Sequence, residues 1–355
     1  MKVLNYVDEN NLSWAIPWIQ ALNFLSAEGI ENVVMCRPGG TLTSMIKEAG
    51  ICCLQYSPPT SIVPALCRGV GEVLTDLHPD IVHTRLSSAA MIAGYWTRKM
   101  GLPLVSTVDK FAKGKYYKRA DRLVAVSQAV ASHCKVKGFP DVPVKVIPNS
   151  IDLERYRKRD FDKHEFREQH GVDRGRTVIL GAGRFVAWKG FDVLIEAAAL
   201  VTKSHPVELW LAGTGPEQED LEILAKDRSV RVKFWGFLDD IRPLMWASDI
   251  FVLPSREPEP FGLVLLEAMA CGLPVFATRA GGPLDMMKGM EDQLFALGNC
   301  EELACRIDKM LSDGSLQYAG SRSSDNAKAF SNSAVAGSLV HLYTGLLSGK
   351  IDQRI

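Results

Sequence analysis

Short runs of aliphatic and β-branched residues alternate with amphipathic stretches along most of the chain. The runs have the length of β-strands, and the stretches between them repeat apolar residues at the spacing of one helix face. In the first half the runs predict strands at Val3–Val7, Asn32–Cys36, Cys52–Tyr56, Asp80–Thr84, Pro103–Val108, Arg122–Val126 and Val144–Ile147. The stretches between them predict helices that include Trp14–Glu28, Ile62–Leu77, Ser88–Met100 and Ser127–Lys137. Such alternation is typical of parallel sheets covered by helices on both faces.

The alternation pauses near Ile147, where Ile147-Pro148-Asn149-Ser150 precedes a charged run from Glu154 to Asp162. Proline, asparagine and dense charge indicate a domain boundary. A second series of strands is predicted near residues 177–182, 207–212, 230–235, 250–254 and 274–277. Beyond about residue 300 only helical patterns remain, and the last spans Ser333–Leu347. We therefore expect an α/β fold with two doubly wound parallel-sheet domains, residues 1–152 and 153–330, and a C-terminal helix in residues 331–355 that packs back toward the first domain.

Composition excludes several classes of protein. Apolar residues make up 47% and charged residues 23% of the 355 positions, which is ordinary for a globular protein and too apolar for extended disorder. The 41 basic residues equal the 41 acidic ones, so no overall charge attracts nucleic acid. No apolar run reaches the roughly 18 residues of a membrane helix, and the N-terminus lacks the apolar stretch of a signal peptide. The eight cysteines form no CxxC pair and are expected to be free thiols in a reducing cytoplasm.

Two segments that follow predicted strands contain residues suited to an anionic ligand: residues 181–190, and Ser255–Gly272. Neither Gly181-Ala182-Gly183 nor Gly213-Thr214-Gly215 continues as a dinucleotide fingerprint, and no Walker loop is present, which weakens an NAD-binding or ATP-hydrolysing function. The loop after the first glycine turn does contain Arg184 and Lys189. Two cations fixed in one loop suit a diphosphate, although a solvated loop would explain either one alone.

The segment Ser255–Gly272 combines a turn, a helix and two carboxylates. Pro260 and Gly262 mark the turn, and a helix is predicted from about Phe261 to Gly272. The free N–H groups of Gly262 and Leu263 would then form an anion site. Glu259 lies beside it and Glu267 about one turn into the helix. Carboxylates so placed suit neutral hydroxyls, while compensation of the helix dipole is the alternative for Glu267.

Glu259 and Glu267, with seven residues between them in EPFGLVLLEAMACGLPV, resemble the EX7E motif of retaining GT-B glycosyltransferases of family 4. The segments IPNSID, GRFVAWKG, LAGTGP and DIFVLP occur in the order of that family. The similarity extends over about the whole chain and is densest from residue 145 to 290.

The resemblance implies two facing Rossmann-like domains, a nucleotide-sugar donor on the second, an acceptor on the first, and no metal or other cofactor. Arg184 and Lys189 would hold the donor diphosphate, Glu259 the sugar hydroxyls and Glu267 the ribose. The implied donor-binding set is Arg184, Lys189, Glu259, Phe261, Gly262, Leu263 and Glu267, and the implied catalytic set is Glu259, Asp109, Arg184 and Lys189. Asp109 follows the fifth predicted strand, where the family usually has histidine.

A basic stretch follows Asp109. Its six cations, with three aromatic residues among them, are Lys110, Lys113, Lys115, Lys118, Arg119 and Arg122. Such a stretch suits an anionic glycolipid or the inner face of the cytoplasmic membrane, and a solvated loop is the alternative.

We therefore predict a retaining, metal-independent hexosyltransferase that acts on a saccharide or lipid-linked acceptor in bacterial surface polysaccharide or lipopolysaccharide assembly. A nucleotide-sugar epimerase or hydrolase of the same fold, or a non-catalytic sugar-nucleotide binder, are the alternatives. The sequence leaves the nucleotide base, the sugar and the acceptor open.

Overall fold

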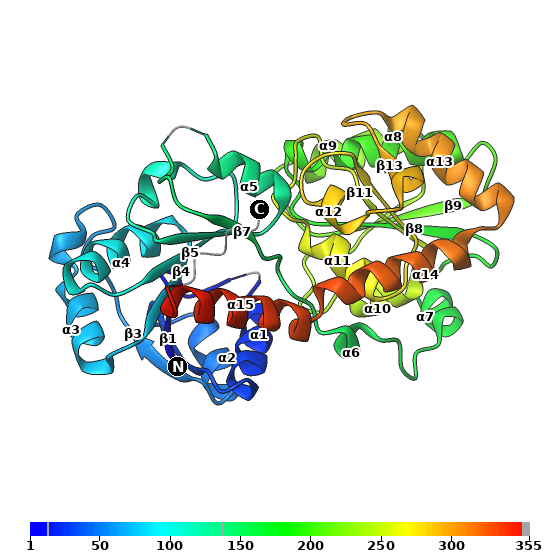
Figure 1. Ribbon diagram of the computed structural model, residues 1–355. Coiled ribbons are helices and arrows are strands. Elements are labelled where there is room, and N and C mark those ends of the chain that lie inside the picture. The colour runs from blue at the N-terminus through cyan, green and yellow to red at the C-terminus, as the bar shows by residue number, and fades with distance from the viewer. Residues whose placement is uncertain (13, 137, 350–355) are drawn as a thin grey trace. The chain divides into compact units, whose positions relative to one another are not determined.

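The computed structural model describes residues 1–12, 14–136 and 138–349, so the final residues of the predicted C-terminal segment lie outside the described part. The chain forms two compact units. Of the described residues, unit 1 contains Met1–Asp152 together with residues 330–349, and unit 2 contains Leu153–Ala329. In Figure 1 the colours run along the chain, and the last helix, drawn in red, lies beside the blue first helix of unit 1.

Among the described residues, unit 1 contains a parallel sheet of seven strands in the order β3-β2-β1-β4-β5-β6-β7. The strands are β1 (Lys2–Val7), β2 (Glu31–Cys36), β3 (Cys52–Gln55), β4 (Ile81–Arg85), β5 (Leu104–Val108), β6 (Arg122–Ala125) and β7 (Val144–Val146). Every strand predicted for this half is confirmed with small shifts at its ends. The strand order reverses between β1 and β4, and ligands of open α/β sheets bind beyond the carboxyl ends at such a point.

The helices of unit 1 cover both faces of this sheet. They are α1 (Ala15–Ala27), α2 (Leu42–Glu48), α3 (Arg68–Leu77), α4 (Ser87–Met100), α5 (Gln128–Cys134) and α15 (Asn332–Leu347). Helices α1, α2 and α15 share a core with Val105 of β5, whereas α4 lies on the opposite face, where the position of Gly94 is close to Leu104. The predicted helix Ile62–Leu77 is wrong in its first part. Pro64 begins a separate 3-10 turn, and α3 begins only at Arg68.

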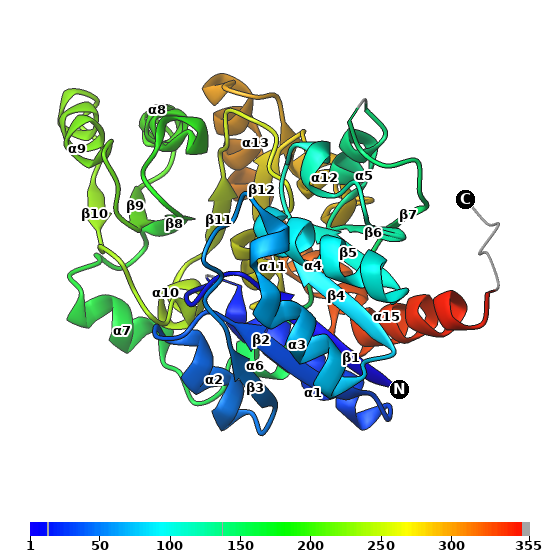
Figure 2. The ribbon, with the colours of Figure 1, turned by 90° about the vertical axis from the view of Figure 1, so that its left-hand side faces the viewer.

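Unit 2 has a parallel sheet of six strands within the described residues, in the order β10-β9-β8-β11-β12-β13. Its strands are β8 (Thr177–Ala182), β9 (Val207–Ala212), β10 (Val232–Phe234), β11 (Ile250–Leu253), β12 (Val275–Thr278) and β13 (Leu294–Phe295). Figure 2 shows β10, β9, β8, β11 and β12 side by side in that order. The sequence did not predict β13, which is two residues long.

Helices also cover both faces of the second sheet. They are α6 (Leu153–Tyr156), α7 (Lys163–Gln169), α8 (Phe191–Val201), α9 (Gln218–Asp227), α10 (Arg242–Ala247), α11 (Leu263–Ala270), α12 (Pro283–Met286), α13 (Cys300–Asp313) and α14 (Leu316–Ala327). In Figure 1, α8, α9 and α13 lie along one face, and α10, α11 and α14 along the other. Because the strands are parallel, the loops after β8, β9, β11 and β12 meet at one edge. Among the described helices, none combines the length and apolar character needed to cross a bilayer.

Candidate functional site

Glycines allow the loops after β8 and β9 to pack backbone against backbone. A Cβ on Gly213 would lie 1.9 Å from the carbonyl oxygen of Gly183, and a Cβ on Gly215 would lie 2.2 Å from that of Phe185. Gly183 N donates to Ala212 O at 2.9 Å across the same contact. The two glycine turns, which do not match a dinucleotide fingerprint, therefore serve to bring the β8 and β9 loops together.

The loops after β11 and β12 join this edge through Glu259. Its backbone pairs with Gly281, and Gly282 N donates to Glu259 O at 2.8 Å. A Cβ on Gly281 would lie 2.1 Å from that carbonyl oxygen, so a larger residue does not fit. Arg256 N donates to Trp188 O at 2.8 Å, which ties the β11 loop to the β8 loop. The position of Glu259 is therefore set by contacts among three loops.

Lys189 and Glu259, which the sequence assigned to different parts of the donor, form one ion pair. Lys189 Nζ donates to Glu259 Oε1 at 2.5 Å, and Ser255 Oγ donates to the same oxygen at 2.7 Å. Only 15% of the lysine side chain and 5% of the glutamate side chain are exposed. No described residue donates a hydrogen bond to Oε2, so this oxygen remains available to a ligand. The Lys189 ammonium also lies 4.4 Å from the centre of the Trp188 ring.

Arg184 follows β8 in the same loop and is exposed. No described residue forms an ion pair or hydrogen bond with its guanidinium. The loop thus presents one free cation and, five residues further on, one paired cation. The sequence predicted both cations in one loop, and the structure shows Arg184 there and Lys189 at the end of a short 3-10 helix, Ala187–Lys189.

Helix α11 begins one turn of chain after Glu259. Gly262 precedes it with φ of 103°, a conformation that favours glycine, and no side chain caps the helix N-terminus. The helix begins at Leu263, later than the predicted Phe261, whose side chain is buried in the turn. A contact from Phe261 to a ligand would therefore come from its backbone, as for Gly262 and Leu263.

Glu267 lies in the second turn of α11 and is held by a residue that the sequence analysis missed. Tyr156 Oη, from α6, donates to Glu267 Oε1 at 2.7 Å. Burial raises the pKa of Glu267, while the hydrogen bond from Tyr156 and the charge of Arg155 oppose that rise. Tyr156 lies in the charged segment that predicted a domain boundary, and nothing in that segment indicated the contact.

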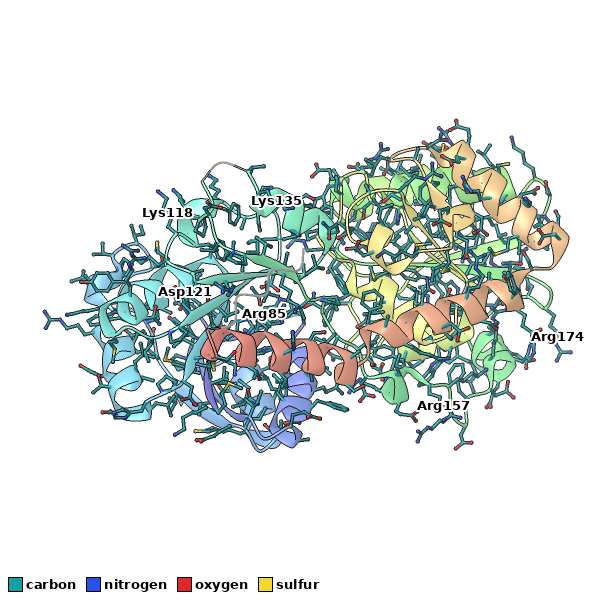
Figure 3. All side chains as sticks on the ribbon, in the orientation of Figure 1. Arg85, Lys118, Asp121, Lys135, Arg157 and Arg174 are labelled. Carbon is teal, nitrogen blue, oxygen red and sulfur yellow. The ribbon has the colours of Figure 1, made fainter. Side chains whose placement is uncertain are left out.

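Asp109 belongs to unit 1, where it follows β5 and is paired with Arg85 at the end of β4. Arg85 Nε lies 3.1 Å from Asp109 Oδ1, and Arg85 Nη2 contacts the same carboxylate and donates to Asn149 Oδ1 at 2.7 Å. The guanidinium carbon lies 4.0 Å from the centre of the Trp14 ring. Figure 3 labels Arg85. Arg85 directly follows the predicted strand Asp80–Thr84, and this position is the signal that could have identified it.

The structure therefore joins Lys189 and Glu259 at one edge of the sheet of unit 2, whereas Glu267 is paired with Tyr156. Asp109 belongs to unit 1. Among the described residues, no group of three His, Cys, Asp or Glu side chains is arranged to hold a metal ion.

Comparison with known proteins agrees with this arrangement of loops. Residues 162–328 match the family model for glycosyl transferases group 1, and residues 19–155 match that for glycosyltransferase family 4. The chain is 36% identical over 304 residues to the lipopolysaccharide core biosynthesis glycosyltransferase LpsE of Rhizobium meliloti (strain 1021), covering 84% of this chain and 86% of LpsE. This chain belongs to the family 4, group 1 glycosyltransferases.

A second relative and a solved structure agree with this family and with the fold. LpsD of the same Rhizobium strain, also a lipopolysaccharide core biosynthesis glycosyltransferase, is 26% identical over 84% of this chain and 85% of LpsD. The crystal structure of Anabaena HepE in complex with UDP has a TM-score of 0.85 at 25% identity and covers 97% of this chain and 100% of that one. These similarities confirm the predicted family and the predicted GT-B fold.

Proposed function

We propose that this glycosyltransferase transfers a hexose from a nucleotide-diphosphate sugar to a saccharide or glycolipid acceptor, with retention of anomeric configuration and without a metal ion. The observation that supports this most directly is the geometry of the β8 loop. Exposed Arg184 follows Gly183, where a Cβ would lie 3.9 Å from the side chain of Lys189, the partner of Glu259. Free and fixed cations beside a carboxylate suit a ligand that is a diphosphate at one end and a polyol at the other. The similarity to LpsE and LpsD favours an acceptor in bacterial lipopolysaccharide core assembly.

The donor would bind along the loops of unit 2. Arg184 would contact the diphosphate as a fork, and the remaining protons of the Lys189 ammonium would contact it as well. The backbone of Phe261, Gly262 and Leu263 at the start of α11 would offer N–H groups to the same anion. For the neutral parts of the donor, Glu259 Oε2 would accept from a sugar hydroxyl and Glu267 from the ribose.

In the reaction that we propose, the bond between the sugar C1 and the phosphate oxygen breaks while the acceptor oxygen bonds to C1 on the same face. The acceptor proton passes to the departing phosphate oxygen. Negative charge then grows on the diphosphate, where Arg184, Lys189 and the start of α11 stabilise it without further reorganisation. Glu259 is already neutralised by Lys189 in a buried pair, which favours a role in orienting the sugar over one as a nucleophile.

The nucleotide and the place of action are further parts of the proposal. UDP is our first candidate for the nucleotide, because HepE binds it in the crystal. We also propose that the enzyme works in the cytoplasm, at the inner face of the cytoplasmic membrane, through the basic stretch from Lys110 to Arg122. Electrostatic docking of that kind should weaken as salt shortens the roughly 8–10 Å screening length.

The test is a transfer assay with a panel of UDP-, GDP- and ADP-hexoses, a lipopolysaccharide core acceptor, and excess EDTA. We expect a product that keeps the anomeric configuration of the donor, as observed by NMR, and activity that EDTA leaves unchanged. An inverted product would overturn the proposed mechanism, and Mg²⁺-dependent recovery from EDTA would overturn metal independence. Turnover without acceptor would indicate an epimerase or hydrolase. Nucleotide binding without any product would indicate a sugar-nucleotide binder.

A further inference from the structure

Unit 1 has a surface cavity of about 790 Å³ beside the carboxyl ends of its central strands. Leu86 and Ser87 follow β4 directly, and the segment from Lys110 to Tyr116 follows β5. Ligands of open α/β sheets bind at this edge. The volume lies within the range of about 300–1,000 Å³ that is usual for small-molecule sites. The cavity therefore has the position and the size of a ligand site.

Positive charge lines one part of this cavity. The charged residues among the described residues of its wall are Lys110, Lys113, Lys115 and Glu9. No described residue forms an ion pair or hydrogen bond with the ammonium groups of Lys110 and Lys113, and the Lys115 ammonium lies 5.1 Å from the centre of the Tyr116 ring. Three lysines against one carboxylate leave an excess of positive charge, which suits an anionic group.

Apolar side chains line another part. Ile62 is 79% exposed and Phe111 is 40% exposed, and Leu86 and Met91 lie in the same wall. A ligand that covers large apolar side chains exposed to water lowers the free energy by about 25 cal/mol per Å² of apolar surface buried. A purely polar saccharide would leave this part of the wall uncovered.

We infer that this cavity, which we call the amphiphile pocket, binds an acceptor that carries a phosphate or carboxylate next to an apolar part. Lys110, Lys113 and Lys115 bind the anionic group, and Ile62 and Phe111 cover the apolar part. The inference rests on the proposed function and names the chemical class of its acceptor.

The rest of the basic stretch serves other contacts. Arg119 lies 5.9 Å from the centre of the Tyr95 ring, and Arg122 donates to the carbonyl oxygen of Asp121. Lys118 is exposed outside the described wall of the pocket. The basic residues of the stretch therefore form two groups, and only Lys110, Lys113 and Lys115 bind the acceptor.

Calorimetric titration of the full chain tests the pocket with three probes: octyl phosphate below its micelle concentration, inorganic phosphate, and octyl glucoside. We expect octyl phosphate to bind at least about tenfold more tightly than either of the others, since it alone satisfies both parts of the wall. Equal affinity for inorganic phosphate would overturn the apolar half of the inference. Equal affinity for octyl glucoside would overturn the anionic half.

Two triple variants with the same change in charge separate the pocket from general electrostatics. K110S/K113S/K115S should lose about tenfold or more in octyl phosphate affinity, because charge-assisted contacts are removed. The control K47S/K99S/K135S changes exposed lysines of unit 1 that lie outside both the pocket wall and the basic stretch, and it should bind as the wild type does. Equal losses in the two variants would overturn the inference and favour a general attraction to anionic surfaces.

A parallel titration with UDP distinguishes this inference from the proposed function. The pocket variants should keep wild-type UDP affinity, because the nucleotide loops belong to unit 2. If the wild type binds UDP but not octyl phosphate, the pocket inference fails alone, whereas absence of nucleotide binding contradicts the proposed function. Thermal unfolding checks that each variant folds. Ile62→Ser, at a highly exposed position, provides a second variant that should weaken octyl phosphate and leave inorganic phosphate unchanged.

Discussion

The Lys189 ammonium and Glu259 Oε1 are 2.5 Å apart, with both side chains largely withdrawn from solvent. Each group therefore fixes the orientation of the other. A buried charge that loses its partner is costly, so neither residue can change without affecting the other. The cation that would bind the diphosphate is therefore coupled to the carboxylate that would bind the sugar.

Alanine variants of Arg184 and Lys189 should differ in stability although both weaken nucleotide binding. We expect each to reduce UDP affinity by roughly 1.5–3 kcal/mol through loss of a charge-assisted contact. Arg184→Ala should leave the free energy of unfolding unchanged, whereas Lys189→Ala should lower it by about 3 kcal/mol because Glu259 stays buried without a partner. Urea unfolding and UDP titration measure the two effects. Equal free energies of unfolding for the two variants would show that the Lys189–Glu259 pair does not stabilise the fold.

Glu267 should make stability depend on pH in a direction set by its burial. Its pKa is raised above the ordinary value of 4.5, so the folded state binds a proton more tightly than the unfolded state. The free energy of unfolding should therefore fall as pH rises above about 4.5 and through the folded pKa. Glu267→Gln removes this titration, and we expect the variant to be more stable than the wild type at pH 7 but to bind UDP about tenfold more weakly.

The matched variant Tyr156→Phe removes the hydrogen bond that favours the charged carboxylate. Its stability should fall more steeply with rising pH than that of the wild type. Urea unfolding from pH 5 to pH 8 gives both slopes. A slope in Glu267→Gln identical to that of the wild type would show that Glu267 does not titrate as its surroundings indicate.

His83 should make the free energy of unfolding fall as pH decreases, which is the opposite of the dependence expected for Glu267. Hydrogen bonds join its Nδ1 to Tyr343 Oη at 2.5 Å and its Nε2 to Thr107 Oγ1 at 2.7 Å, and burial lowers its pKa to about 3. The unfolded state takes up a proton first, so stability is lost as pH falls from about 6.5 toward 3. Between pH 6.5 and 5 we expect a loss of about 2 kcal/mol. His83→Gln should reduce it, and an unchanged loss in chemical denaturation would assign the effect to other groups.

The sequence predicted the strands well because buried parallel strands are continuous apolar runs between turn residues. It failed where that signal is short or interrupted. β13 has two residues, and Pro64 divides a pattern that otherwise resembles one helix. These features depend on packing or on one residue's backbone, which periodicity does not report.

The sequence indicated candidate residues for the site but not the pairs that they form. The turn and helix around Gly262 are local, so their sequence indicates them directly. The partner of Glu259 is 70 positions away and that of Glu267 is 111 positions away, and only the fold brings them into contact. For the same reason the sequence placed a carboxylate at Asp109 without its neutralising partner, Arg85.

Arg85 and Asp109 provide the sharpest test of the histidine-to-aspartate difference from the family. Each side chain is 11% exposed, so Arg85→Met should lower the free energy of unfolding by about 3 kcal/mol by leaving Asp109 without its partner. The double variant R85M/D109L removes both charges and should recover much of that loss, since a buried pair contributes little beyond apolar residues of similar size. If Asp109 contacts a substrate, transfer should remain impaired in the double variant although stability returns. Urea unfolding together with kcat and KM for the donor separates the two roles, and wild-type transfer by the double variant would remove Asp109 from the catalytic set.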